Sequence, residues 1–231
     1  MQGGRTISFW QLLALIGAGA LTAIFALYSW LEPGLRGAGW RIPAEVSHSA
    51  LATPASLNFQ GLVNHDGAPV GREELTGKWR LLFLGYTYCP DICPTALNDM
   101  ASLMNSLSKS HPDLARDTGL IFLSVDPDRD TPARLKEYAS YFHPEIRGMV
   151  GPMDRLQAIG RSLGAFFASS KKSPEDKEYA VVHPANIYLV DPQGRACARF
   201  SNQLTIADVE KEYLKIRAWA GKQDEAKGKA K

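Results

Sequence analysis

The chain has 231 residues and a mass of 25.3 kDa, and 45% of its residues are hydrophobic while 22% are charged. This composition can bury a core, so it excludes wholesale disorder and collagen-like repeats. Lys and Arg number 26 and Asp and Glu number 24, so the net charge is only +2 and we expect no nucleic-acid partner. The three cysteines are too few for a disulfide-stabilised scaffold, and their odd number leaves at least one unpaired within the chain.

The N-terminal region is predicted to anchor the chain in a membrane. Residues 9–31 form an uncharged, apolar run of the length that a transmembrane helix needs, and Trp10, Tyr28 and Trp30 lie where interfacial aromatic residues belong. A cleaved signal peptide is the alternative, but the run is longer than the usual apolar region of a signal peptide. We therefore expect a short head at 1–8 and a single-pass anchor in a bacterial inner membrane.

Two low-complexity segments flank the part of the chain that is expected to fold. Residues 32–56 are rich in Gly, Pro, Ala and Ser and are predicted to be a linker. Residues 221–231 are polar and rich in Lys, which is typical of a flexible, solvated tail. A single soluble domain is therefore predicted at about 57–220.

Two buried strands, each followed by a helix, are predicted near the start of this domain. Residues 80–85 and 119–125 are short apolar runs bounded by Gly or by Asp-Pro, as expected of strands buried on both faces. One helix is predicted from Pro94, and another from Pro132 with Thr131 as its cap. Two successive strand-helix units imply a parallel pair of strands joined by a right-handed crossover.

A hairpin and a last helix complete the predicted domain. Residues 185–190 and 196–200 flank the sequence DPQG at 191–194, which has the signature of a type I turn. A last amphipathic helix is predicted to begin at Thr205. The order βαβ, helix, ββα predicts an α/β, thioredoxin-like fold with a central mixed sheet flanked by helices.

The segment most informative about function contains two thiols. Cys89 and Cys93 are four residues apart, where a buried strand is followed by a helix, and Pro90, Asp91 and Pro94 around them favour an exposed turn. A helix N-terminus stabilises a thiolate, so we expect the pKa of Cys93 to be lowered. Thiolates are both nucleophiles and ligands of soft metals, so disulfide exchange and metal binding both remain open.

A third ligand would favour metal binding over disulfide exchange. His183 lies just ahead of a predicted strand, at the end of the sheet where a thioredoxin-like fold presents its dithiol loop. Two thiolates and one imidazole are one ligand short of a structural zinc site and suit three-coordinate Cu(I). Oxidation of Cys89 and Cys93 to a disulfide would abolish this binding.

Three motifs make a family resemblance specific. They are GYTYCPDICP at 85–94, SVDPDRDT at 124–131, and His183 followed by IYLVD at 187–191. In these motifs, and in the sequence GKW at 77–79, the chain resembles the Sco1/SenC (PrrC) family of membrane-anchored copper-binding proteins that serve cytochrome c oxidase assembly. The resemblance spans about residues 57–220.

The resemblance implies a fold, a metal and a partner. The fold would be a thioredoxin fold with an N-terminal hairpin, in a domain on the periplasmic side, which makes the head at 1–8 cytoplasmic. Cys89, Cys93 and His183 would bind copper, as Cu(I) or Cu(II), and deliver it to the binuclear copper site of cytochrome c oxidase subunit II. Other periplasmic copper chaperones or thiol reductants are further expected partners. The alternative hypothesis is a thiol-disulfide oxidoreductase with Cys89 and Cys93 as the redox-active pair and Cys89 as the attacking thiol.

Several residues near these motifs are interpreted without a catalytic role. Val182 stands where the family commonly has an acidic residue, and Pro184 follows the histidine. Cys197 is expected to be a small buried hydrophobic residue, and the polar segment 169–178 a solvated loop that a partner could face. Three acidic residues are expected to cap the helix at 132 rather than to bind a hard cation, namely Asp126, Asp128 and Asp130. Three aromatic residues of that helix are expected to lie in the core, namely Tyr138, Tyr141 and Phe142.

Overall fold

The computed structural model describes residues 44–46, 48–173 and 175–228, together with residues 19, 21–23 and 26–27. Apart from those last few positions, the predicted head and anchor lie outside the described residues. Within the described part of the chain, no helix has both the length and the apolar character needed to cross a membrane. The chain divides into two compact units, at 1–41 and 42–231, and the second contains the folded domain.

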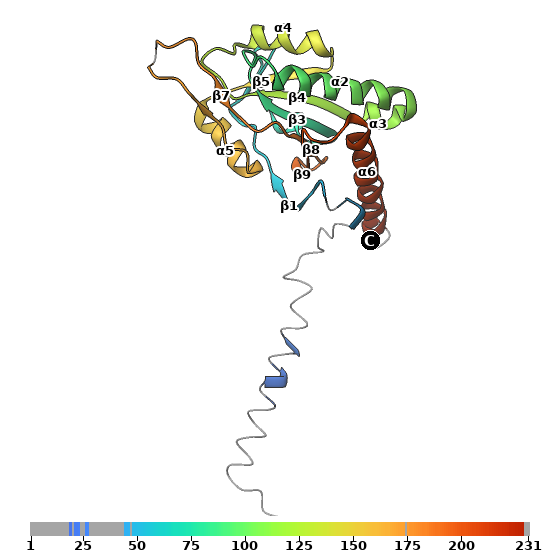
Figure 1. The fold of residues 1–231 in the computed structure, drawn as a ribbon. Coiled ribbons are helices and arrows are strands. Elements are labelled where there is room, and N and C mark those ends of the chain that lie inside the picture. The colour runs from blue at the N-terminus through green and yellow to red at the C-terminus, as the bar shows by residue number, and fades with distance from the viewer. Residues whose placement is uncertain are drawn as a thin grey trace, which may run out of the picture. The chain divides into compact units, whose positions relative to one another are not determined.

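A seven-stranded mixed sheet forms the centre of this domain, with the strand order β1-β9-β8-β3-β4-β5-β2 (Figure 1). Three neighbouring strands are parallel, namely β3 (Trp79–Gly85), β4 (Thr118–Ser124) and β5 (Ile146–Val150). β8 (Ile187–Val190) is antiparallel to β3, and β9 (Arg195–Phe200) is antiparallel to β8. The sheet confirms the predicted α/β, thioredoxin-like class, including the parallel pair and the hairpin.

The central strands are buried on both faces, as their continuous apolar sequences predict. In β3 and in β4, every residue except the second is buried. The register pairs Phe83 with Phe122, and their rings stack with centroids 6.3 Å apart. This aromatic layer lies directly behind the end of β3, which is where the dithiol loop begins.

Two helices cover one face of the sheet. Because β3, β4 and β5 are parallel and follow one another in space, right-handed crossovers bring α2 (Ile92–Ser110) and α4 (Pro132–Phe142) to the same face, where they contact each other (Figure 1). α4 begins as predicted, because the Thr131 side chain accepts a hydrogen bond from the Arg134 amide at 3.3 Å. α2 begins two residues earlier than predicted, so Cys93 lies in its first turn.

The last helix, α6 (Ile206–Gly228), confirms the prediction and extends beyond it. It packs against α2 and buries Val209, Tyr213 and Ile216. The predicted flexible tail from residue 221 is therefore helical as far as residue 228. The reason is that Lys, Gln, Glu and Ala, which dominate this segment, are strong helix formers.

The domain begins earlier than predicted, and its first strands pair differently. Part of the predicted linker forms β1 (Ala50–Ser56), which pairs antiparallel with β9 at one edge of the sheet. This pairing uses backbone groups and needs no apolar alternation, and Pro54 is tolerated on an edge strand. β2 (Val63–Asn64) pairs with β5 at the opposite edge. β1 and β2 do not pair with each other, but a short antiparallel hairpin is present at residues 62–70, where the Asn64 amide donates to the Ala68 carbonyl and the Val70 amide to the Leu62 carbonyl, each at 2.9 Å.

β5 and α5 (Met153–Leu163) are also not predicted from the sequence. β5 escapes prediction because Arg147 and Gly148 interrupt its short apolar run. α5 contacts β1, and in Figure 1 it lies on the opposite side of the strands from α2 and α4. The shorter elements are η1 (Ala44–Val46), η2 (Arg72–Glu74) and α3 (Pro112–Arg116).

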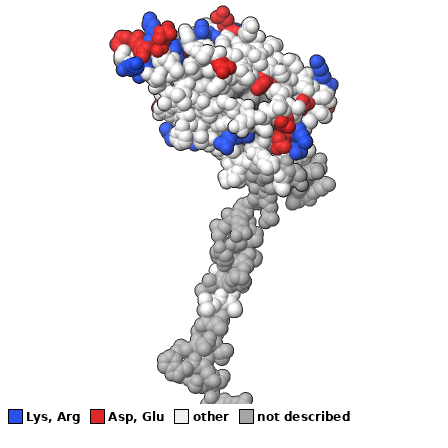
Figure 2. All heavy atoms as spheres, viewed as in Figure 1, with Lys and Arg blue, Asp and Glu red and all other residues white. Residues whose placement is uncertain are grey.

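A small two-stranded ribbon carries the polar loop that precedes His183. β6 (Ala168–Ser169) pairs antiparallel with β7 (Val181–Val182), and the loop between them projects from the domain (Figure 1). Figure 2 shows acidic and basic side chains gathered on this projection. At its base, the Lys171 ammonium lies 2.6 Å from the carboxylate of Asp128. The described residues of the loop are largely exposed, as expected of a solvated segment.

Two expectations about buried side chains have different outcomes. Cys197 is fully buried, and its thiol donates a hydrogen bond to the Leu189 carbonyl at 3.4 Å, which confirms its interpretation as a core residue. Tyr141 is 85% exposed, so its assignment to the core is wrong. α4 buries the face that carries Leu135 and Ala139, and Tyr141 lies outside that stripe.

Candidate metal centre

Cys89 and Cys93 lie on the turn that joins β3 to α2. The turn closes where the Cys89 amide donates a hydrogen bond to the Tyr86 carbonyl at 3.2 Å. Because α2 begins at Ile92, the Cys93 amide is one of the free N–H groups of the first helical turn, and it points at the Cys89 sulfur at 3.4 Å. The start of the helix therefore holds the first sulfur beside the second cysteine.

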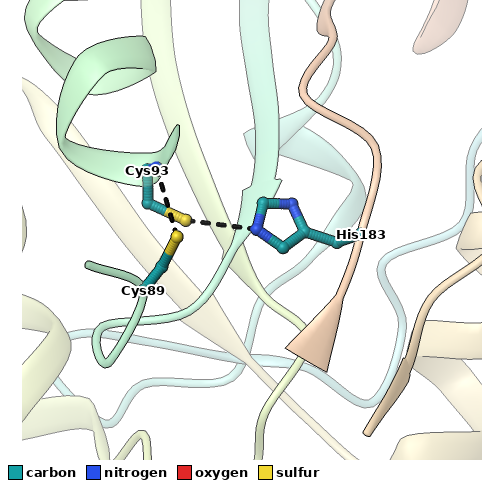
Figure 3. A group of neighbouring side chains, drawn as sticks. All are labelled: Cys89, Cys93 and His183. Carbon is teal, nitrogen blue, oxygen red and sulfur yellow. Dashed lines mark hydrogen bonds between the residues drawn. The ribbon is translucent and has the colours of Figure 1, made fainter. Parts of the chain in front are cut away.

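His183 reaches the two sulfurs from the segment between β7 and β8 (Figure 3). Its Nε2 atom lies 3.4 Å from the Cys93 Sγ atom. The three potential ligand atoms of Cys89, Cys93 and His183 all lie within 4.8 Å of one another. The fold thus brings together the three residues that the sequence singles out, although the histidine is 90 residues downstream of Cys93.

The imidazole of His183 is oriented by its surroundings with Nε2 toward the sulfurs. Its Nδ1 atom lies 3.2 Å from the Pro184 carbonyl oxygen, which favours the tautomer with the proton on Nδ1 and the lone pair on Nε2. The rings of Phe83 and Tyr86 meet the imidazole edge to face, with centroids 5.9 and 5.6 Å away. Burial lowers the pKa of His183, so the ring is held in the neutral form that can bind a metal.

The carbonyl of Pro184 takes the orienting place that a carboxylate often has beside a metal-binding histidine. Val182, which replaces the family's acidic residue, is 72% exposed. That position therefore contributes to the surface of the domain.

Burial, and not the helix N-terminus, dominates the chemistry of Cys93. The side chain is fully buried, and desolvation raises the pKa of its thiol far above the usual value. The predicted lowering is wrong because the cost of an anion in apolar surroundings exceeds the stabilisation by the helix. Cys89 is also only 9% exposed, although Pro90 and Asp91 between the two cysteines are exposed, so the turn is exposed as predicted while both cysteine side chains are enclosed. Without a bound cation, the Cys93 thiol therefore keeps its proton.

Gly85, the last residue of β3, makes room for the Cys93 sulfur. A Cβ atom at this position would lie 2.6 Å from Cys93 Sγ and 2.9 Å from the rings of both Phe83 and Phe122. A glycine that directly follows an apolar strand is the available sequence signal, because it often marks the close approach of another group.

Asp130 fixes the dithiol loop from the side of β4. Its buried carboxylate accepts hydrogen bonds from the Thr87 amide at 3.0 Å, from the Thr87 hydroxyl at 2.6 Å and from the Ser124 hydroxyl at 2.6 Å. The prediction that Asp130 caps the following helix is wrong. Thr131 performs that role, and Asp130 turns inward to satisfy the buried donors.

Asp126 links the dithiol side of the domain to the segment that carries His183. Its carboxylate accepts hydrogen bonds from Arg129 Nε at 2.6 Å and from the Tyr179 hydroxyl at 2.6 Å, so it does not cap the helix either. The guanidinium of Arg129 also lies over the Tyr179 ring, 3.6 Å from its centroid, and 5.6 Å from the centroid of the Tyr86 ring. These contacts tie the chain just before the histidine to the start of the dithiol loop.

Comparisons with known proteins give the chain a family. The SCO1/SenC family model matches residues 50–218. The chain is 34% identical over 186 residues to the SCO2-like protein of Rickettsia felis, and this match covers 80% of this chain and 84% of that protein. A Stutzerimonas stutzeri protein is 38% identical over 133 residues, but the match covers only 63% of its length.

Solved structures agree with this match. The structure of Bradyrhizobium japonicum ScoI with copper bound has 32% sequence identity and a TM-score of 0.57, covering 72% of this chain and 97% of that one. The structure of BsSco has 25% sequence identity and a TM-score of 0.54, and the match covers 69% of this chain and 91% of that one. BsSco is described as a member of the Sco family of cytochrome c oxidase assembly proteins in which a disulfide switch was identified. Because the matched residues 50–218 include both cysteines of the dithiol loop and His183, the chain belongs to the SCO1/SenC family.

Proposed function

We propose that this chain is a copper chaperone that binds copper through Cys89, Cys93 and His183 and delivers it to the binuclear copper site of cytochrome c oxidase subunit II. One observation carries the proposal. Two sulfur atoms and one imidazole nitrogen converge within 4.8 Å in a chain of the SCO1/SenC family. The copper-bound structure of the related ScoI supports the choice of metal.

The donor atoms and their spacing suit copper. Ligand atoms that are about 2.0–2.3 Å from one ion lie roughly 3.5–4 Å apart in a trigonal arrangement, so only small shifts are needed from the present spacing. Two thiolates favour Cu(I), and the imidazole suits either Cu(I) or Cu(II). Three ligands leave the coordination open, which permits a ligand of the recipient to enter before a ligand of the chaperone leaves.

The burial of the ligands suggests an order for this exchange. Cys93 is fully buried, whereas Cys89 retains a small exposed fraction. A thiol of the recipient would therefore displace Cys89 first, while Cys93 and His183 still hold the ion. His183 needs no proton transfer to bind or release copper, because burial keeps its imidazole neutral.

We further propose that residues 9–31 anchor the chain in a bacterial inner membrane, with the domain in the periplasm and the head at 1–8 in the cytoplasm. The uncharged run in the sequence supports the anchor, and the resemblance to membrane-anchored relatives supports the orientation. The metal donor would be another periplasmic copper chaperone, and a periplasmic thiol reductant would keep the two cysteines reduced.

A second candidate function is reduction of the disulfide of the recipient site before copper arrives. The contact between the Cys93 amide and the Cys89 sulfur and the disulfide switch of the related BsSco favour it. The Cys89 thiolate would attack the target disulfide, form a mixed disulfide and release one target thiolate. The Cys93 thiolate would then displace the second target sulfur, which leaves a Cys89–Cys93 disulfide and a reduced target. The thiol reductant would restore the dithiol.

Titration with Cu(I) separates the two functions. The reduced full-length chain in detergent should bind one copper against a competing chelator, and His183→Ala should weaken binding by more than the roughly 10–100-fold typical of losing an orienting partner. His111→Ala is the matched control, because this exposed histidine lies at the opposite end of α2 from Cys93. Equal affinity of wild type and His183→Ala would contradict the proposed site. Reduction of an oxidised subunit II domain at a rate indifferent to His183→Ala would favour the second function.

A further inference from the structure

A groove begins beside the metal centre and follows the first turns of α2. It has a volume of about 210 Å³ and lies between α2, the β8–β9 hairpin and the start of α6. Asp91 and Ile92, which immediately precede Cys93, line it on one side, and Ala185, two residues after His183, lines it on another. The groove therefore opens next to the proposed copper ligands.

The groove is too small for most cofactors and is polar along one wall. At about 210 Å³ it is smaller than the sites of about 300–1,000 Å³ that hold small-molecule ligands. Asp91, Thr95 and Asp99 line it at intervals of four residues, which places them on one face of α2 over a length of about 12 Å. The apolar residues that line it include Ile187, Phe200, Leu204 and Val209. These dimensions suit one long side chain and the backbone next to it.

Asp99 carries a charge that the described part of the domain does not compensate. It is half-buried, and burial alone raises the pKa of its carboxyl, with no cation nearby to oppose the shift. Among the residues that the structure describes, no ion pair or side-chain hydrogen bond involves it. A charge that is partly desolvated without a partner is unfavourable for the isolated fold. Its presence in the wall of a groove favours a cationic partner from outside the domain.

Three exposed apolar or aromatic side chains border the metal centre. Tyr88, Ile92 and Val182 are 48%, 42% and 72% exposed, and each is the immediate chain neighbour of one of the three proposed ligands. Exposed apolar side chains grouped around an exchange site are typical of a surface that another protein covers. Ile92 also lines the groove, so the apolar surface and the groove are continuous.

We infer that the groove receives a segment of the protein that takes the copper, and that this segment places a Lys or Arg side chain against Asp99 while its apolar residues cover Ile92. The inference rests on the proposed delivery to subunit II and specifies how the recipient docks. A basic residue complements the uncompensated carboxylate, and the continuity of the groove with the metal centre aligns the docked segment with the copper ligands. Such a contact raises the rate of productive encounter and leaves the affinity for copper unchanged.

Copper transfer measured in rapid-mixing experiments tests the charge. The Cu(I)-loaded full-length chain in detergent is mixed with the reduced, copper-free soluble domain of subunit II, at several salt concentrations. Asp99→Asn should slow transfer by roughly 3–10-fold at low salt and reduce the dependence of the rate on salt. Asp154→Asn, which removes an exposed carboxylate on α5, is the control for net charge and should leave the rate unchanged. Both variants should bind Cu(I) as tightly as wild type.

A second variant tests the space. Thr95 is exposed on the wall of the groove, so Thr95→Trp fills the groove without entering the core. It should slow copper transfer by at least about tenfold at all salt concentrations, because the indole excludes the whole recipient segment from the groove, whereas Asp99→Asn removes only one charge contact. Wild-type transfer rates in both Asp99→Asn and Thr95→Trp would refute docking of the recipient in the groove but would leave the delivery function standing. The same conclusion would follow if Asp154→Asn slowed transfer as much as Asp99→Asn does. Wild-type protein that binds copper but transfers none would overturn the delivery function and this inference with it.

Discussion

The glycine that ends β3 allows a direct test of the packing behind the metal centre. In Gly85→Ala, the new methyl group would lie 2.6 Å from Cys93 Sγ and 2.9 Å from the rings of Phe83 and Phe122. All three neighbours are fully buried, so none can move into solvent to relieve the contact. Overpacking of a core costs about 1–3 kcal/mol, and three simultaneous close contacts place the expected loss of unfolding free energy near about 3 kcal/mol.

Urea unfolding of the reduced, metal-free protein, followed by circular dichroism, measures this loss. With a slope of about 2 kcal/mol per molar urea, the loss corresponds to a midpoint lower by about 1.5 M. Gly119→Ala is the matched control, since this glycine also lies in a buried strand but its Cβ would approach within 3.4 Å only the flexible Arg80 side chain. Its cost should stay below about 1 kcal/mol. Equal midpoint shifts in the two variants would refute the packing argument.

A double-mutant cycle identifies the group that the glycine accommodates. Cys93→Ala removes the nearest of the three contacts, so Gly85→Ala should cost at least about 1 kcal/mol less in that background than in wild type. Additive losses would mean that the aromatic rings, and not the sulfur, require the glycine. In that case Gly85→Ala would not displace the Cys93 sulfur.

The polar contacts around the site give three further expectations. Asp130→Ala leaves the Thr87 amide and the Ser124 hydroxyl without an acceptor and should lower the unfolding free energy by about 2–4 kcal/mol, whereas Asp130→Asn keeps one acceptor and should lose less in the same urea assay. Burial raises the folded-state pKa of Asp130 above 3.8, so the contribution of this residue to stability declines as pH rises from 3.8 through the folded pKa. Asp130→Asn does not titrate, so the difference in urea midpoint between wild type and this variant should change with pH in that interval. Because burial keeps the Cys93 thiol protonated, Cu(I) binding should release protons and the apparent affinity in a chelator competition should rise between about pH 6 and 8; a flat profile would contradict a thiolate ligand.

The parts of the fold that are predictable from sequence are those with local signals. β3 and β4 are continuous apolar runs, and the cap at Thr131 followed by proline marks the start of α4. The pairing of β1, by contrast, has no local sequence signal. Its small residues carry no alternation, and the strand is defined by hydrogen bonds to β9, which is more than a hundred residues away in sequence. No pattern within residues 50–56 contains that information.

The candidate site shows the same division. The positions of Cys89 and Cys93 follow from the strand-helix junction, which is a local feature. Their surroundings are fixed by contacts that only the folded chain supplies, such as the hydrogen bond of Asp130 to Thr87, 43 residues away, and that of Tyr179 to Asp126, 53 residues away. A general rule about helix N-termini therefore predicts the wrong direction for the pKa of Cys93, because the rule assumes a solvated thiol.

The enclosure that raises the thiol pKa also lowers the imidazole pKa, so without copper Cys93 and His183 both favour their uncharged forms. In the proposed centre, Cu(I) replaces the thiol protons of Cys89 and Cys93, and the ion with two thiolates carries one net negative charge, which the N-terminus of α2 stabilises. Protons and copper therefore compete for the same sulfurs, and the buried site binds protons more strongly than a solvated dithiol would. A recipient with more exposed, less basic thiols loses less of its copper affinity to this competition at the same pH. In the proposed delivery, this competition from protons at Cys93 would favour transfer toward solvated thiols at a given pH.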